Sequence, residues 1–258
     1  AGLAPAKPWL DRIAGVKTLD DLAMLWAEPG FASPISAGVG IDAKQPDRHI
    51  AQVGFGGIGL PDRDYYLDTS EKGVAIQTKY KQYLAFLLSE AGYADAAAMA
   101  ERVYAFEDAN ARTVQWDRAV RRNRDLTYNL LTADELVALG GKVPVAAMLQ
   151  EIGVAGSPGF VVSLMPPTAE EVAQYKLDAA TLAKIGTGLP GMMALVSETP
   201  VDVLKAWMVK EFLSDHAAVL PARFDAASFE FFGKTLRGTP EQRPRWKRAI
   251  GETEGLIG

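Results

Sequence analysis

The sequence predicts a mainly α-helical, multi-helical domain that carries a small β-hairpin element. Apolar residues recur at helical spacing in several long segments, whereas strand signals are confined to residues 36–55 and 160–164. The 258 residues are 48% hydrophobic and their mean hydropathy is near zero, which is typical of a soluble globular chain that can bury a sizeable core.

A hairpin is expected first along the chain. Residues 36–41 and 48–55 give strand signals and flank the turn-rich run Asp42-Ala-Lys-Gln-Pro-Asp47. Much later, the short β-branched run at residues 160–164, Phe-Val-Val-Ser-Leu, predicts one further strand.

Two helices are expected to follow the hairpin. The first runs from about Glu71 to Ala91, where Gly92 ends it, and the second from about Asp95 to Trp116. The residues that share the apolar stripe of the first helix are Ile76, Tyr80, Tyr83, Leu84, Leu87, Leu88 and Ala91, and those of the second are Met99, Val103, Phe106, Asn110 and Val114.

Two more helices are expected in the C-terminal third. One begins after Pro200 and runs from about Val201 to Leu220, and the other begins near Pro240. The stripe of the first consists of Leu204, Trp207, Met208, Phe212, His216 and Val219. The stripe of the second is still running at Leu256-Ile257-Gly258, so we expect that helix to continue beyond the sequence.

The sequence predicts a single domain over residues 1–258. It shows no internal repeat, no low-complexity stretch and no long Ser/Gly linker. With 27 Lys and Arg against 32 Asp and Glu, the net charge is −5. This charge balance does not indicate the basic surface that nucleic-acid-binding proteins use. Arg118, Arg121, Arg122 and Arg124 form a local basic run, interpreted as a solvated or salt-bridged helix end without a partner.

No apolar run approaches the roughly 20 residues that span a bilayer, and the N-terminus lacks the hydrophobic region of a signal peptide. The segment itself is therefore expected to make no membrane contact. The absence of cysteine excludes disulfides and thiolate chemistry without deciding the compartment.

The run Gly54-Phe-Gly-Gly-Ile-Gly59 fits the G-x-G-x-x-G pattern of dinucleotide sites. Such a site needs the loop to open a helix whose N-terminus faces the pyrophosphate. Here Leu60-Pro61-Asp62 follows and no helical pattern appears before about Glu71, so we interpret the glycines as a tight turn at a strand end.

Four segments resemble one known family. They are Gly59-Leu-Pro-Asp-Arg-Asp-Tyr-Tyr66, Arg121-Arg-Asn-Arg-Asp-Leu-Thr-Tyr-Asn-Leu-Leu131, Thr199-Pro-Val-Asp-Val-Leu-Lys-Ala-Trp207, and the run from Phe229 to Arg248 with Gly-Lys-Thr-Leu-Arg-Gly-Thr-Pro at its centre. In order and spacing they resemble the N-terminal helical region of the neprilysin-like zinc metallopeptidases. Residues 166–197 depart from that pattern as a longer segment of uncertain structure.

The resemblance implies a two-lobed zinc endopeptidase in which this chain is part of the N-terminal capping lobe. Its partners would be the catalytic C-terminal lobe of the same polypeptide and short peptides enclosed between the lobes. A bacterial parent would be extracytoplasmic, either periplasmic or membrane-anchored. Peptide specificity, cavity-lining residues and oligomeric state do not follow from the resemblance.

Zinc peptidases of this family use H-E-x-x-H on a helix, because the four-residue spacing puts both imidazoles on one face. The only histidines are His49, followed by Ile-Ala-Gln-Val, and His216, followed by Ala-Ala-Val-Leu, so neither begins the motif. We expect no catalytic residue and no metal ligand in this chain, and zinc only in the missing lobe. His49 is interpreted as a hairpin residue, and His216 as a buried residue bonded to a carbonyl or carboxylate.

Two motif segments could be mistaken for catalytic clusters. Gly59–Tyr66 offers two carboxylates, a guanidinium and two phenols, which we interpret as a structural lock with internal partners. In Pro244-Arg-Trp-Lys-Arg248, Trp246 is expected to pack and the basic residues to pair with acids or face the other lobe. The alternative function is a stand-alone helical module that binds peptides or proteins without protease activity.

Overall fold

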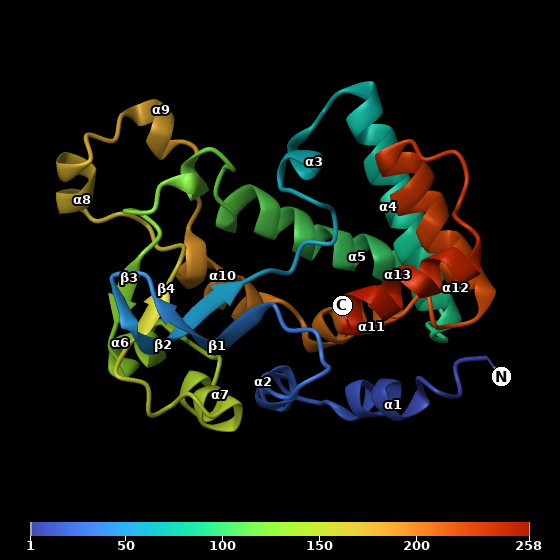
Figure 1. Ribbon diagram of the computed structural model, residues 1–258, viewed down its shortest axis with the longest axis horizontal. Coiled ribbons are helices and arrows are strands. Elements are labelled where there is room, and N and C mark those ends of the chain that lie inside the picture. Colours follow the sequence, from blue (N-terminus) through green and yellow to red (C-terminus); the bar gives the residue numbers. More distant parts are fainter. Residues whose placement is uncertain (1, 258) are drawn as a thin grey trace.

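The computed structural model describes residues 2–257, and it confirms a mainly helical fold with a small sheet (Figure 1). The α-helices are α1 (Lys7–Gly15), α2 (Leu19–Ala27), α3 (Asp64–Leu67), α4 (Glu71–Glu90), α5 (Ala96–Ala109), α6 (Ala133–Leu139), α7 (Val145–Ile152), α8 (Ala169–Gln174), α9 (Ala179–Leu182), α10 (Gly188–Glu198), α11 (Val201–Asp215), α12 (Ala222–Ser228) and α13 (Arg245–Ile257). The described helices do not include one long and apolar enough to cross a membrane.

The sheet contains β1 (Ile35–Asp42), β2 (Gln45–Phe55), β3 (Asn129–Leu131) and β4 (Phe160–Val162) in the order β1-β2-β4-β3. The predicted hairpin is confirmed, because β1 and β2 pair antiparallel from Ile35 opposite Phe55. The predicted strand near residue 160 is β4, which runs parallel to β2 and antiparallel to β3. Helices α2, α7 and α10 pack against β1 and β2.

The predicted helices α4 and α5 begin at side-chain caps. The hydroxyl of Ser70 accepts from Gly73 N at 3.1 Å, and Asp95 Oδ1 accepts from Ala98 N at 3.1 Å. After α5 the chain continues as a π-helical turn, Asn110–Val114, which extends the segment almost to the predicted end.

Helix α11 begins as predicted but ends at Asp215, five residues before the predicted end at Leu220. Pro221 lies just beyond, and the residue before a proline is disfavoured in the helical conformation. The prediction that Val219 belongs to the buried stripe is therefore wrong, since 76% of its surface is exposed.

The last helix, α13, begins at Arg245 and not near Pro240. Pro244 pushes the residue before it toward an extended conformation, which delays the helix. The prediction that Trp246 packs is also wrong, because 62% of this residue is exposed. The predicted stripe ends at Leu256, Ile257 and Gly258, which lie outside the residues whose side chains the structure describes.

The segment 166–197, left open by the sequence, contains α8, α9 and most of α10. Leu189, Met192 and Val196 of α10 are fully buried, whereas α8 and α9 contribute no buried residue. Within the described part of this segment, only α10 therefore contributes fully buried side chains to the main core.

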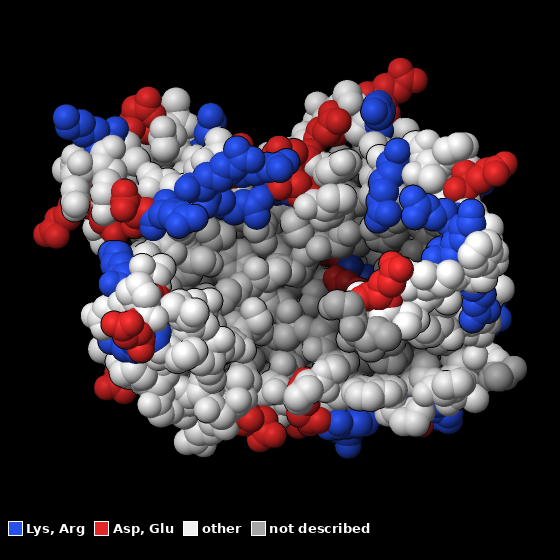
Figure 2. Space-filling view, in the orientation of Figure 1, with Lys and Arg blue, Asp and Glu red and all other residues white. Residues whose placement is uncertain are grey.

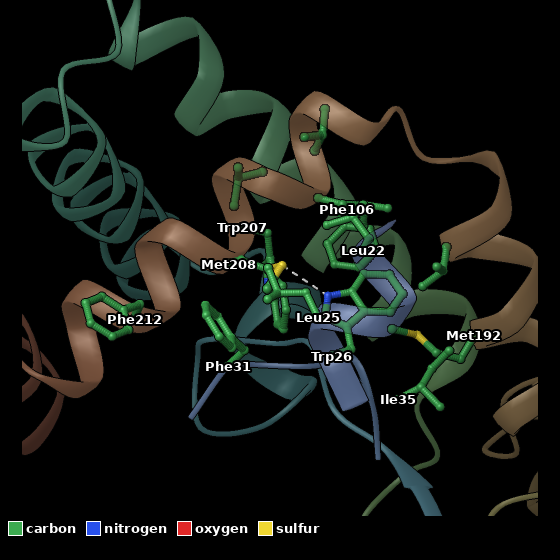
Figure 3. Packing of buried hydrophobic residues seen from close by; sticks show 14 of the residues in the cluster. Leu22, Leu25, Trp26, Phe31, Ile35, Phe106, Met192, Trp207, Met208 and Phe212 are labelled. Atoms are coloured by element: carbon green, nitrogen blue, oxygen red, sulfur yellow. Dashed lines mark hydrogen bonds between the residues drawn. The ribbon is translucent and has the colours of Figure 1, made fainter. Parts of the chain in front are cut away.

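The main core joins helices from both ends of the chain (Figure 3). Trp26 of α2 inserts between α10 and α11, and its indole N–H donates to the Met208 sulfur at 3.1 Å. Trp207 packs edge-on against Phe106 of α5, with ring centroids 6.1 Å apart. A single cluster of buried residues extends from Ala6 to Phe231, so α1, α2, α4, α5, α10 and α11 share one core.

A buried carboxylate closes the β1–β2 turn. Asp42 is fully buried, forms an ion pair with Arg48, and accepts hydrogen bonds from Lys44 N at 2.8 Å and Tyr128 Oη at 2.9 Å. The Arg48 hydrogen bond is the main reason why the pKa of Asp42 falls from 3.8 to about 2, against the opposing effect of burial. The turn is thereby tied to the residue that precedes β3.

The pH dependence of this lock can be measured. Since the folded pKa of Asp42 lies below the unfolded one, the ionised carboxylate stabilises the folded state above about pH 4, and this stabilisation is lost as the pH falls toward about 2. We expect a difference in Tm between the wild type and Asp42→Asn that is full at pH 6 and shrinks on acidification. A constant difference, or a carboxyl NMR titration of Asp42 centred near its ordinary value, would contradict the lock.

Candidate functional site

The two histidines lie apart in the fold and neither is buried. His49 on β2 is exposed and faces Ile41 across the hairpin, as expected for a hairpin residue. His216 follows α11, with Nδ1 2.8 Å from the carbonyl oxygen of Phe212 and its ring stacked on the Phe212 ring. The predicted carbonyl bond of His216 is confirmed, but its predicted burial is wrong because α11 ends before it.

The described side chains do not fit a catalytic zinc ion. Among the described residues, no group of three or more His, Asp or Glu side chains is placed to hold a metal. A zinc site needs three protein ligands around one ion, so no chemical step through zinc can be derived from this chain.

The Gly54–Gly59 run does not open a helix that could hold a pyrophosphate. The run starts in the last residues of β2 and continues beyond the strand as an irregular segment. The side-chain amide of Asn110 donates to Gly56 O at 2.7 Å. Gly57 has a φ of +85°, a conformation that favours glycine. The first helix after it is the four-residue α3, which begins at Asp64, earlier than the predicted Glu71 but too short to form an anion site.

The most distinctive chemistry in the described chain is a buried cluster around Glu107 of α5. Its Oε2 accepts hydrogen bonds from the hydroxyls of Tyr66 at 2.7 Å and Tyr80 at 2.8 Å, and its Oε1 lies 2.6 Å from the ammonium of Lys210 on α11. Glu107 is fully buried and Lys210 is 2% exposed. The cluster thus joins α3, α4, α5 and α11 at one point.

The ammonium of Lys210 lies between two carboxylates, those of Glu107 and Glu211. Lys210 Nζ also lies 2.7 Å from a carboxylate oxygen of Glu211. Burial alone would lower the pKa of Lys210, but the Glu107 and Glu211 carboxylates raise it above its ordinary value. Burial, followed by the Glu107 charge, raises the pKa of Tyr66 and Tyr80, so both phenols remain protonated donors.

The Gly59–Tyr66 motif wraps around this cluster. The Tyr66 hydroxyl accepts from the backbone N–H groups of Gly59 and Leu60, both at 3.1 Å, while it donates to Glu107. A Cβ on Gly59 would lie 1.9 Å from the Tyr80 hydroxyl and 2.6 Å from Lys210 Nζ. Only glycine fits at this position.

The charged groups of the motif also have internal partners. Arg63 donates to Gln115 O at 2.8 Å, and Asp62 accepts from Arg121 at 2.7 Å. Arg112 donates to Tyr66 O at 2.7 Å. These contacts agree with the interpretation of the motif as a structural lock, and Arg121 belongs to that lock.

Glu107 and Lys210 were not identified from the sequence. A signal was present, because Lys210 interrupts the apolar run Trp207-Met-Val209 and Phe212 within one helix, and Glu107 follows Phe106 of the predicted stripe. Charged residues are almost never fully buried unless they are paired. Two such residues on two apolar helices therefore indicate a buried pair.

One face of the molecule is hollowed (Figure 2). The floor of the hollow is mostly uncharged, and Lys and Arg side chains form a row along its upper border, over the segment between α5 and β3 in Figure 1. Concave surfaces of this kind are where proteins enclose ligands.

A family model of the N-terminal part of peptidase family M13 matches residues 1–258. The chain belongs to this family. The neprilysin-like resemblance is thereby confirmed over the whole sequence.

M13 relatives include human endothelin-converting enzyme 1, which is 28% identical over 244 residues, covering 93% of this chain and 29% of the relative. The bovine enzyme is 28% identical over 235 residues, covering 89% of this chain and 28% of the relative. The chain therefore spans less than a third of these curated relatives.

Two solved structures superpose well on the fold. The zinc metalloprotease Zmp1 of Mycobacterium tuberculosis, in complex with an inhibitor, matches with a TM-score of 0.81 at 26% identity, covering all of this chain and 37% of that protein. PepO of Lactobacillus rhamnosis matches with a TM-score of 0.69 at 19% identity, which supports the fold alone.

Proposed function

We propose that this chain is the non-catalytic, substrate-enclosing N-terminal lobe of a zinc-dependent endopeptidase that acts on short peptides. The observation that carries the proposal is the match of the M13 N-terminal model to residues 1–258, while the chain covers only 37% of the zinc metalloprotease Zmp1. The missing lobe would supply H-E-x-x-H and the zinc.

The structure supports a capping role in two ways. The shared core from Ala6 to Phe231 favours a single rigid domain, and the hollowed face provides a concave wall. A wall of this kind limits substrates by size before any side-chain contact acts. The catalytic C-terminal lobe of the same polypeptide is the proposed partner, and an extracytoplasmic location is proposed because the relatives include endothelin-converting enzyme 1.

The isolated chain provides a direct test. We expect the purified chain to contain no stoichiometric zinc by elemental analysis and to leave a fluorogenic peptide uncleaved, because its two histidines lie on separate elements. Peptide cleavage with stoichiometric zinc, abolished by His49→Ala or His216→Ala, would contradict the non-catalytic role.

The encoding gene provides an independent test. We expect the reading frame past the Gly258 codon to continue into H-E-x-x-H. A stop codon there would instead favour a stand-alone module that binds peptides or proteins.

A further inference from the structure

A groove of about 640 Å³ lies over the open face of the sheet. Its floor is formed by small or uncharged residues of β1, β2 and β4, and its wall by the segment before β3, which contributes Arg124, Thr127 and Tyr128. Gly38 and Gly54 leave the strand backbone uncovered on the floor. Part of the strand backbone is therefore accessible at the floor of the groove.

The border of this groove is an unprotected sheet edge. β1 is the outermost strand and pairs only with β2 among the described strands. Edge strands are usually protected by charge or proline, yet residues 35–41 of β1 contain neither. Val39 and Ile41 are 67% and 60% exposed. The edge can thus donate and accept main-chain hydrogen bonds with an extended peptide.

The segment that provides the wall carries concentrated positive charge, and its Arg124 lines the groove itself. Residues 118–125 contain four arginines and one aspartate, whereas the whole chain has a net charge of −5. Arg121 pairs with Asp62, but Arg118, Arg122 and Arg124 are exposed, and no described carboxylate forms an ion pair with them. The screening length is about 8 Å at physiological salt, so the distant acidic residues do not cancel this local field.

The chemistry of the wall favours carboxylates. A guanidinium presents a planar fork that binds a carboxylate through two parallel hydrogen bonds, and it is more weakly hydrated than a lysine ammonium. Tyr128 is held in place by its bond to Asp42, and the Lys44 ammonium lies 4.3 Å from its ring centre. The wall beside Arg124 is therefore anchored to the hairpin.

We propose that this groove binds an extended acidic peptide segment whose backbone lies along β1. Its Asp or Glu side chains pair with Arg124 in the groove and with the exposed Arg118 and Arg122 of the same segment, which lie outside the groove lining. The lobe then selects acidic substrates as well as short ones. Calling the peptide a substrate rests on the proposed function, whereas binding in the groove can be tested without any peptidase activity.

The test is a titration of the chain with a short fluorescent peptide of alternating Glu and Val, amidated at its C-terminus, followed by anisotropy. The Arg118→Gln/Arg122→Gln/Arg124→Gln variant is expected to bind it about tenfold more weakly, because it loses three ion pairs that act together. The matched control is Lys17→Gln/Lys72→Gln/Arg237→Gln, which changes the net charge equally at three exposed residues outside the groove. This control is expected to bind like the wild type.

Two further probes decide the ligand class. A peptide with Gln in place of Glu is expected to bind weakly to every variant, and a single-stranded oligonucleotide is expected to bind weakly to the wild type. Equal binding of the Glu and Gln peptides, equal losses in the two triple variants, or oligonucleotide binding as tight as the acidic peptide would each overturn the proposal. Circular dichroism of each variant verifies that these surface changes leave the fold intact.

Discussion

Replacing Lys210 with Met is expected to lower the free energy of unfolding by about 3–5 kcal/mol. The substitution keeps the volume of the side chain but leaves the fully buried Glu107 carboxylate without its cation. Removing one member of a buried pair costs more than the pair contributes, because the remaining charge stays in a medium of low polarity. Urea unfolding followed by circular dichroism measures the change.

Two variants separate this effect from general damage. The Glu107→Gln/Lys210→Met variant is expected to be more stable than Lys210→Met alone, because the fully buried position 107 no longer carries an unpaired charge and its side-chain oxygen can still accept from Tyr66 and Tyr80. Lys234→Met breaks an exposed pair with Glu230 and is expected to change stability by less than about 1 kcal/mol. If Lys210→Met were no worse than Lys234→Met, Glu107 would not depend on Lys210.

The second large effect is expected for Gly59→Ala, with a loss of about 3 kcal/mol, at the upper end of what overpacking costs. The added Cβ would lie 1.9 Å from the Tyr80 hydroxyl and 2.6 Å from Lys210 Nζ, so the buried cluster or the motif backbone must move. Either movement lengthens the hydrogen bonds that Gly59 N makes with Tyr66 and Glu107. Thermal unfolding and the urea midpoint both report the loss.

The neighbouring Gly56 provides the control. A Cβ on Gly56 meets nothing within 4 Å, so Gly56→Ala is expected to change stability little. Adding Tyr80→Phe to Gly59→Ala removes the hydroxyl nearest the new methyl group, and the double variant is expected to lose less than the sum of the two single losses. Similar losses for Gly56→Ala and Gly59→Ala would show that the close approach at Gly59 does not determine stability.

Local sequence patterns predicted an element correctly where its structure depends on residues within the same segment. The stripe from Ile76 to Ala91 predicted α4, and the turn-rich run from Asp42 to Asp47 predicted the hairpin between β1 and β2. In both cases the spacing of apolar residues and the turn chemistry lie within one segment.

Predictions were wrong where a boundary depended on proline. The stripe of α11 was extended through His216 to Val219, although Pro221 favours an earlier end, and α13 was started before Pro244. The apolar periodicity of the sequence continues across such positions, but the helix does not, because proline restricts the backbone conformation of the residue before it. His216 and Val219, which are both exposed, lie beyond the observed end of α11.

By itself, the sequence determined the mainly helical class, the hairpin and the M13 family, because these depend on periodicity, turns and long ordered motifs along the chain. Only the tertiary structure decided that Glu107 and Lys210 meet, that Gly59 leaves no room for a methyl group, and that Arg124 stands over an open sheet face. Each of these depends on the distance between residues on separate elements. Such distances are set by how the elements pack and not by any pattern within one of them.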